Sequence, residues 1–163
     1  MKIAIISDTH DHLYNLREAV KIIKEEGVST IIHLGDIISP FVVKEFGVNK
    51  VYAVFGNNDG DKDLLRERFE AEGYEIQRGP RELLIDNRRF LLMHEPHLID
   101  GFIKSGLWDI ILFGHTHKLS IEEGIPLVIN PGELCGYLTG KSTFVLLETS
   151  DLNYKIVESK NYT

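Results

Sequence analysis

The sequence predicts an α/β fold with a two-layer β core and helices on the outside. In the first third of the chain, short β-branched apolar runs alternate with stretches whose apolar residues recur about every 3.6 positions, the pattern of βαβ units. The last third is expected to be mostly antiparallel β-structure. The sequence shows no linker, repeat or low-complexity segment, so we expect residues 1–163 to form one domain.

Strands are expected where β-branched and aromatic residues form short apolar runs bounded by turn residues. These runs lie at residues 2–6, 28–34, 50–55, 74–77, 81–85, 88–93, 108–113, 119–122, 127–129, 142–148 and 154–158. Asp86 and Asn87 separate two of the runs and are typical of a tight hairpin turn. The last two runs are expected to pair as a meander.

Helices are expected where the apolar residues follow the helical period between cap and stop signals. These segments are residues 12–26, 61–72 and 96–105, with a further short helix that opens at Ser39 and Pro40. Asp11 is placed to cap the first helix, and Gly27 is placed to end it. Ser39 is a suitable cap residue, and proline suits the first helical position that follows it.

The bulk composition limits the possible partners and the compartment. A formal net charge of -7 disfavours sequence-independent nucleic-acid binding, which depends on Lys and Arg. No apolar run approaches the ~18 residues that a membrane span needs, so no membrane partner is expected. The single cysteine, Cys135, permits no disulfide within the chain, and we expect a cytoplasmic protein. A nucleophilic role for Cys135 is disfavoured because no basic partner lies near it in sequence.

Five of the expected strands end in side chains that can bind metal ions. These side chains are Asp8 and His10, Asp36, Asn57, His94, and His115 with His117. Because ligands bind at the carboxyl edge of parallel strands, we expect the five strand ends to form one site. Carboxylate, imidazole and amide donors without thiolate suit Mn, Fe, Co, Ni or Zn. The donors are too numerous for one zinc ion, and two metal ions that share a carboxylate would account for them.

The same strand ends carry five short motifs in a known order. They are Asp8-Thr9-His10, Gly35-Asp36, Gly56-Asn57-Asn58-Asp59, His94 and Gly114-His115-Thr116-His117. On these motifs the chain resembles the calcineurin-like metallophosphoesterase superfamily, and within it the small YfcE-type phosphodiesterases of bacteria and archaea. The resemblance extends to Asn130-Pro131-Gly132 and covers the whole chain. It implies a four-layer αββα sandwich that carries a two-metal site.

The resemblance also implies roles for the residues of the site. The first metal ion would be held by Asp8, His10, Asp36 and His117, and the second by Asp36, Asn57, His94 and His115. The implied activity is that of a metal-dependent phosphoesterase, more specifically a phosphodiesterase, that attacks a small phosphorylated substrate in line with a metal-bridging hydroxide. Manganese is the first expected metal, with Ni, Co, Fe and Zn as alternatives. The family's habit of forming dimers makes a homodimer the expected oligomer.

The sequence departs from the family pattern at three places near these motifs. One is His94-Glu95-Pro96-His97, where the small relatives often have His-Gly-His. Asn58 stands where the family has a histidine that is thought to act as a general acid or substrate contact, and asparagine cannot deliver a proton. The leaving group would then receive its proton from water or from His97, and esters with leaving groups of low pKa should be preferred. Glu133 stands where a serine commonly follows Asn-Pro-Gly.

Several alternative interpretations stay open. The chain could be a non-catalytic scaffold like a retromer subunit of similar fold with degraded metal motifs, although every ligand position here carries a ligating residue. A phosphomonoesterase or a nuclease is also possible in principle, but the chain has no basic strip. Among the other polar residues, we expect His33 to be a core histidine with a backbone partner and His12 to be a surface residue. Asp59 is expected either to orient Asn58 or to be a simple turn residue.

Overall fold

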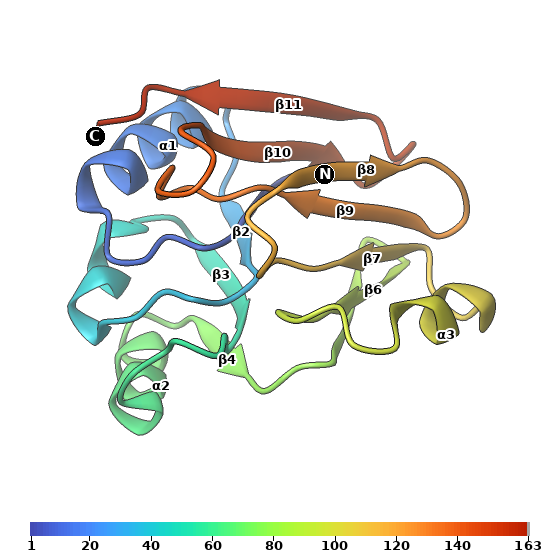
Figure 1. Cartoon of the computed structure of the whole chain (residues 1–163), viewed down its shortest axis with the longest axis horizontal. Coiled ribbons are helices and arrows are strands. Elements are labelled where there is room, and N and C mark those ends of the chain that lie inside the picture. Colours follow the sequence, from blue (N-terminus) through green and yellow to red (C-terminus); the bar gives the residue numbers. More distant parts are fainter. Residues whose placement is uncertain (163) are drawn as a thin grey trace.

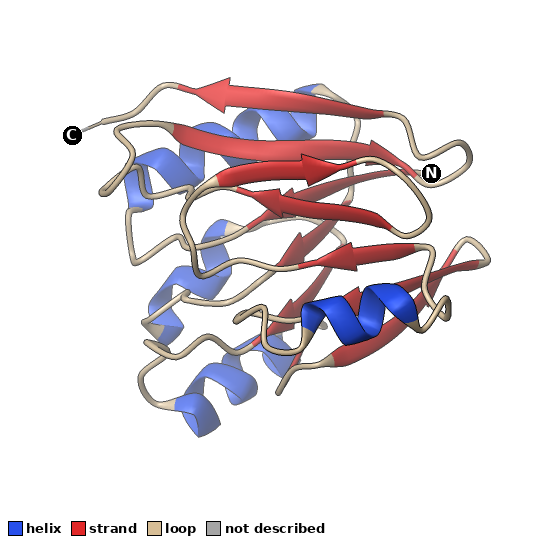
Figure 2. Ribbon diagram, turned by 45° about the vertical axis from the view of Figure 1, so that its right-hand side comes forward, coloured by secondary structure: helices blue, strands red, loops and turns tan. Residues whose placement is uncertain are grey.

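The computed structural model describes residues 1–162, and Thr163 lies outside the described residues. Two β-sheets pack face to face, and helices cover their outer faces (Figures 1 and 2). The helices α1 (Leu13–Glu25) and α2 (Lys62–Ala71) and the 3-10 helix η1 (Pro40–Glu45) cover one sheet, and α3 (Ile99–Lys104) covers the other. The predicted four-layer arrangement is therefore confirmed.

The first sheet is built around four parallel strands, the first three of which come from the βαβ part of the sequence. Its order is β11-β10-β1-β2-β3-β4, with β1 (Lys2–Ile6), β2 (Thr30–His33), β3 (Lys50–Val54), β4 (Glu75–Gln77), β10 (Ser142–Glu148) and β11 (Tyr154–Ser159). Strands β1 to β4 pair in parallel, and β10 and β11 add an antiparallel meander, as predicted. The carboxyl ends of β1, β2 and β3 thus lie side by side.

The second sheet combines a parallel centre with antiparallel edges. Its order is β5-β6-β7-β9-β8, with β5 (Arg81–Ile85), β6 (Arg88–Leu92), β7 (Ile110–Leu112), β8 (Leu119–Glu122) and β9 (Leu127–Pro131). The last third of the chain is mostly antiparallel as predicted, but β7 pairs in parallel with both β6 and β9. The reason is that α3 provides a crossover between β6 and β7, which lets them run in the same direction.

The core explains why β1 is an uninterrupted apolar run. Ile3 and Ile5 face the second sheet, while Ala4 and Ile6 face the helices, so both faces of the strand are buried. A third cluster joins the outer face of the second sheet to α3. Within residues 1–162, no helix has the length and apolar character that crossing a bilayer requires.

The helix starts differ from the sequence predictions at three points. His12, rather than Asp11, caps α1, since its Nδ1 accepts a hydrogen bond from the Asn15 N–H at 3.3 Å. Asp11 instead accepts hydrogen bonds from the backbone N–H and the hydroxyl of Ser39, so Ser39 does not cap η1. The α3 helix begins at Ile99 because Leu98 has a left-handed backbone, with φ 59°. His12 is also buried, so its prediction as a surface residue was wrong.

His33 is the core histidine that the sequence predicts. Its side chain is fully buried, and Nδ1 accepts a hydrogen bond from the Gly35 N–H at 3.1 Å. Nε2 lies 3.1 Å from the Thr9 hydroxyl, and the ring meets Phe46 edge-on. Complete burial lowers the pKa of His33 to about 3, because the charged imidazole would lose its hydration.

Replacing His33 by Asn should weaken the pH dependence of stability between pH 6 and 4. The unfolded chain takes up a proton at this histidine below about 6.5, whereas the folded chain does not do so until about 3. The wild type therefore loses about 1.4 kcal/mol of unfolding free energy per pH unit through this group as the pH falls across that window. Urea unfolding at several pH values measures the slope. His97→Gln, which changes an exposed histidine, should keep the wild-type slope, and an equally steep slope in His33→Asn would contradict the account.

Candidate metal centre

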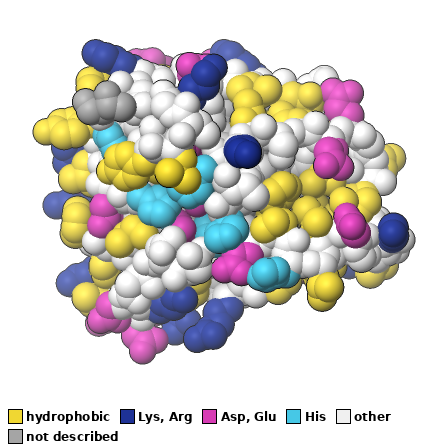
Figure 3. Space-filling model, in the orientation of Figure 1, with side chains coloured by type: hydrophobic (Ala, Val, Ile, Leu, Met, Phe, Trp, Pro, Cys, Tyr) yellow, Lys and Arg dark blue, Asp and Glu magenta, His cyan; other side chains and the backbone are white. Residues whose placement is uncertain are grey.

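The structure brings together the seven predicted metal ligands at the carboxyl ends of five strands. Asp8 and His10 follow β1, Asp36 follows β2, Asn57 follows β3, His94 follows β6, and His115 and His117 follow β7. Histidine side chains gather at the middle of one face of the molecule (Figure 3). Because both sheets contribute, the site lies where their edges meet, as the sequence predicts.

The loops that carry these residues have an unusual backbone. Asp8, His10, Asp36, His115 and His117 all have positive φ, between 42° and 65°. This left-handed conformation is uncommon outside glycine, although Asp and His adopt it more readily than most residues, and it persists where the surroundings enforce it. Backbone hydrogen bonds supply part of that constraint, from Asp8 N–H to Gly35 O at 3.1 Å and from His10 N–H to Asp36 O at 3.0 Å.

Two glycines let the carboxylates approach the backbone closely. A Cβ at Gly56 would lie 2.1 Å from Oδ1 of Asp36, and a Cβ at Gly114 would lie 2.1 Å from the Ser7 hydroxyl and 3.0 Å from Asp8 Oδ2. Real side chains cannot approach so closely, so any other residue would displace the acidic groups. The Gly56-Asn57 and Gly114-His115 pairs in the sequence therefore have a steric origin.

One group of acceptor atoms surrounds Asp8. His117 Nε2 lies 3.4 Å from Asp8 Oδ1, and His10 Nε2 lies 3.8 Å from the same oxygen and 3.5 Å from Asp36 Oδ2. Asp8 Oδ1 and His10 Nε2 are both buried and have no hydrogen-bond partner among the described residues. A buried polar atom normally has a partner, so two such acceptors side by side fit the ligand set of a cation.

A second group of acceptor atoms surrounds Asn57. Its Oδ1 lies 2.9 Å from His94 Nε2 and 3.0 Å from His115 Nδ1, and His94 Nε2 lies 3.4 Å from Asp36 Oδ2. His94 Nδ1 lies 2.7 Å from the Leu34 carbonyl, which can only accept, so Nδ1 carries the proton of a neutral ring. In that neutral form His94 Nε2 is an acceptor that faces other acceptors, whereas in the protonated form it can donate to Asp36. Asp36 Oδ2 belongs to both groups.

The spacing and charge of these atoms fit divalent metal ions. Ligands at 2.0–2.2 Å from a tetrahedral ion lie ~3.3–3.6 Å apart, close to the separations of 3.4–3.8 Å found here. The nearby Asp8 carboxylate raises the pKa of His10. Burial lowers the pKa of His94, but the nearby Asp36 carboxylate outweighs this effect, and the net result is a raised pKa of His94. Without metal the centre therefore attracts protons, which metal ions would displace.

Asn58 and Asp59 hold Asp36 and its neighbouring loops in place. The Asn58 backbone N–H and side-chain amide donate to the two Asp36 oxygens, each at 2.8 Å. Burial would raise the pKa of Asp36, but hydrogen bonds from His94 and Asn58 hold it well below its usual range. Asp59 accepts hydrogen bonds from Ile37, Ile38 and Gly56 N–H groups at 2.6–2.8 Å, so it joins two loops. It does not orient Asn58, and it is more than a turn residue.

His97 lies apart from the clustered acceptors. Its side chain is exposed and pairs with the Glu95 carboxylate, at 2.5 Å from Nε2. Both residues line a cleft that also contains Asn57 and His94. The structure thus places His97 beside the centre rather than in it.

Glu133 also contributes to the centre, a role that the sequence does not reveal. Its carboxylate is fully buried, and His117 Nδ1 lies 2.6 Å from Oε2. The remaining donors to this carboxylate are the Leu138 N–H, the Thr139 N–H, the Thr139 hydroxyl and the Cys135 thiol. Burial would raise the pKa of Glu133, but these hydrogen bonds lower it to about 2. By accepting from Nδ1, Glu133 leaves Nε2 of His117 free to face Asp8.

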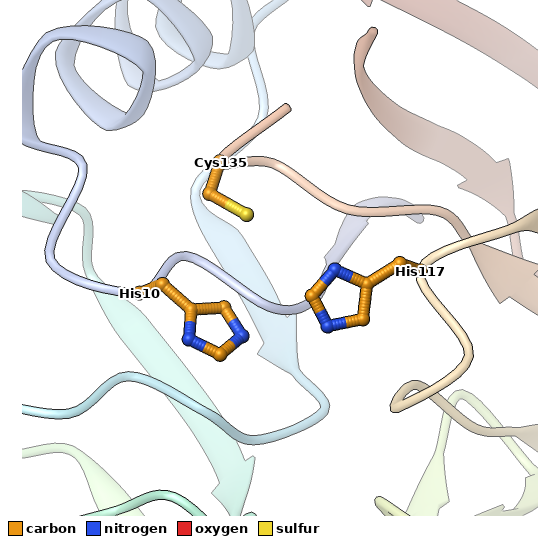
Figure 4. A group of neighbouring side chains, drawn as sticks. All are labelled: His10, His117 and Cys135. Carbon is orange, nitrogen blue, oxygen red and sulfur yellow. The ribbon is translucent and has the colours of Figure 1, made fainter. Parts of the chain in front are cut away.

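Cys135 lies between the two histidines of the Asp8 group. Figure 4 shows its thiol near the rings of His10 and His117, and the three ligand atoms lie within 4.8 Å of one another. The thiol donates to Glu133 at 3.2 Å, and burial raises its pKa to about 12. A thiol of such high pKa is a poor nucleophile, in agreement with the sequence analysis.

The chain is similar to proteins of one enzyme superfamily. Residues 1–152 match the model of the calcineurin-like phosphoesterase superfamily domain. Phosphodiesterase MJ0936 of Methanocaldococcus jannaschii is 45% identical over 161 residues, which cover 95% of this chain and 97% of that protein. A solved structure of an archaeal phosphodiesterase is 43% identical, with a TM-score of 0.90, and the match covers 97% of this chain and 99% of that one. The fold is also that of YfcE, an Escherichia coli phosphoesterase, at 20% identity and a TM-score of 0.68 over 98% and 100% of the two chains.

Replacing Glu133 by Gln should lower the unfolding free energy of the metal-free protein by about 3 kcal/mol at pH 7. A carboxamide cannot accept from all the donors around Glu133, and its own NH₂ group would face other donors. The pKa of this carboxyl is about 2 in the folded chain and about 4.5 when unfolded, so the difference should shrink as the pH falls from about 4.5 toward 2.

Urea unfolding at several pH values tests this expectation. Glu67→Gln on α2 is the matched control, because it makes the same chemical change at an exposed position. If the two variants are equally stable at pH 7, Glu133 does not have the stabilising role assigned to it.

Proposed function

Because this chain belongs to the calcineurin-like phosphoesterase superfamily, we propose that it is a metal-dependent phosphodiesterase that hydrolyses a small phosphorylated substrate. The observation that carries the proposal is that acceptor atoms from five strand ends gather in two groups that share Asp36 Oδ2. Within residues 1–162, Asp8 Oδ1 and His10 Nε2 of these groups are buried and have no hydrogen-bond partner. Such a set of atoms is unstable unless positive charge lies among them. The high identity to a phosphodiesterase over most of both chains supports the diester as substrate.

The family implies divalent metal ions, and we propose two of them here. One would be held by Asp8, His10, Asp36 and His117, and the other by Asp36, Asn57, His94 and His115. The imidazole, carboxylate and amide donors favour transition metals, with manganese first and Ni, Co, Fe and Zn as alternatives. When bound, these ions supply positive charge to the phosphoryl oxygens and activate the attacking water.

The chain's own residues would orient this centre. Asn58 fixes both oxygens of Asp36, the Leu34 carbonyl fixes the His94 ring, and Glu133 fixes the His117 ring. The contacts to His94 and His117 each leave the opposite ring nitrogen facing the centre, so the site is organised before a ligand arrives. The backbone constraints on Asp8 and Asp36 serve the same end.

The source of the leaving-group proton is the main chemical question at this site. The Asn58 side-chain amide is already used to bind Asp36, and it has no proton to transfer. We assign the proton to water or to His97, which lines the adjoining cleft. Either donor would favour leaving groups of low pKa.

A cytoplasmic location, a single domain over residues 1–163 and a homodimer through the exposed face of the β10–β11 meander stay predictions.

Metal-stripped protein should regain activity on bis-p-nitrophenyl phosphate when Mn, Ni, Co, Zn or Mg is supplied separately. Asp36→Ala should reduce that activity by roughly 10³-fold, because metal-based stabilisation is worth several kcal/mol. Asp100→Ala, which removes an exposed acid on α3, is the matched control and should be fully active. Faster hydrolysis of p-nitrophenyl phosphate would identify a monoesterase. Absence of turnover while two metal ions bind would favour the non-catalytic scaffold.

Asn58→His should speed the hydrolysis of an alkyl phosphodiester by up to ~100-fold, the low end of general acid catalysis. The nitrophenyl diester should gain little, since its leaving group needs no proton. Because the change also removes the side-chain hydrogen bond to Asp36, Asn58→Ala measures that cost separately. If Asn58→His hydrolyses the alkyl diester no faster than Asn58→Ala does, a histidine at position 58 does not act as the proton donor, and this account of the position is wrong.

A further inference from the structure

A cleft adjoins the candidate metal centre on the side of Asn57 and His94. It encloses about 290 Å³, and besides those two residues it is lined by Phe55, Lys62, Arg78 and Glu95 among others. This volume is at the lower end of the ~300–1,000 Å³ typical of small-molecule sites. A single substituent of a substrate bound at the centre would fit there, whereas a polymer would have to extend beyond it.

The cleft carries two positive charges in an acidic protein. Lys62 and Arg78 both line it, although the chain has a formal net charge of -7. Neither side chain forms an ion pair within residues 1–162, whereas the cleft carboxylate of Glu95 pairs with His97 at 2.5 Å. Figure 3 shows Lys and Arg side chains gathered below the central histidines, toward α2 and β4. The cations are therefore available to a ligand.

The backbone places both cationic residues beside the centre. An added Cβ at Gly79 would lie 3.3 Å from Met93 Cα, so the loop that carries Arg78 packs directly on the segment that leads to His94. Lys62 is the first residue of α2, which the Asp61 side chain caps just after the loop that carries Asn57. Its ammonium lies 5.8 Å from the centre of the Phe55 ring, which holds the side chain at the cleft wall.

From these features we infer that the cleft binds a second phosphate of the substrate, an inference that rests on the proposed phosphodiesterase function. A phosphomonoester dianion matches two cations better than a single negative charge does. The planar guanidinium of Arg78 can bind two phosphate oxygens at once, and Lys62 adds a compact charge. The preferred substrate is thus a small diester whose non-reacting substituent ends in a phosphate.

Two diesters that release the same leaving group test this inference. They are p-nitrophenyl 2-phosphoethyl phosphate and p-nitrophenyl ethyl phosphate, which differ only in the terminal phosphate. The metal-loaded wild type should have a ~10-fold or greater preference in kcat/KM for the first, mainly through a lower KM, as charge-assisted hydrogen bonds allow. Arg78→Gln and Lys62→Gln should each reduce the ratio of the two kcat/KM values. Lys104→Gln on α3 makes the same charge change as Lys62→Gln at an exposed site away from the cleft and should keep the ratio. The inference would be overturned if the wild type hydrolysed the two diesters with nearly equal kcat/KM, or if Arg78→Gln kept the wild-type preference.

Calorimetry separates this inference from the proposed function. Ethylene glycol bisphosphate and ethyl phosphate are titrated into the metal-loaded wild type and Arg78→Gln. Tighter binding of the bisphosphate that depends on Arg78 would support the cleft even if neither diester is hydrolysed, in which case only the proposed function fails. Equal binding of the two compounds by the wild type would overturn the cleft assignment even if the diesters are hydrolysed.

Discussion

The carboxylate of Asp36 is the group on which the rest of the site depends. It is buried at the end of β2, its backbone has φ 57°, and its Oδ2 lies within 3.5 Å of both His10 and His94. Gly56 must be glycine to admit it, and Asn58 donates to both of its oxygens. Because Asp36 belongs to both groups of acceptors, the positions of the two groups are coupled through a single side chain.

This arrangement is costly for the folded chain, and the surrounding layers offset the cost. Five site residues adopt left-handed backbones, and two buried acceptor atoms lack partners in the described structure. Each feature opposes folding by an amount on the order of 1–3 kcal/mol. Strands β1 and β2 are buried between the second sheet and the helices, and β7 is buried between the first sheet and α3, so the loops are held on a rigid base. Metal ions at the centre would relieve the unpaired charge and stabilise the same geometry.

Two further features flank the centre. Glu133 is a buried acceptor for His117, the loop at residues 138–139 and Cys135. The cleft between β3, β4 and β6 adds Lys62 and Arg78 next to Asn57 and His94. The first feature concerns how firmly the centre is held. The second concerns which substituents a substrate can carry, so orientation and specificity lie on opposite sides of Asp36.

The sequence by itself determined the order of the strands and helices and the convergence of the seven candidate ligands, because apolar period and strand-end position are local properties. It could not decide which residue caps α1, since both Asp11 and His12 can do so and only the contact between Asp11 and Ser39 across 28 residues selects His12. It also missed the parallel pairing of β7, which depends on the crossover through α3. The roles of Asn58, Asp59 and Glu133 depend on which polar groups face them from distant segments. Such contacts exist only after the sheets have packed, so the tertiary structure alone decided them.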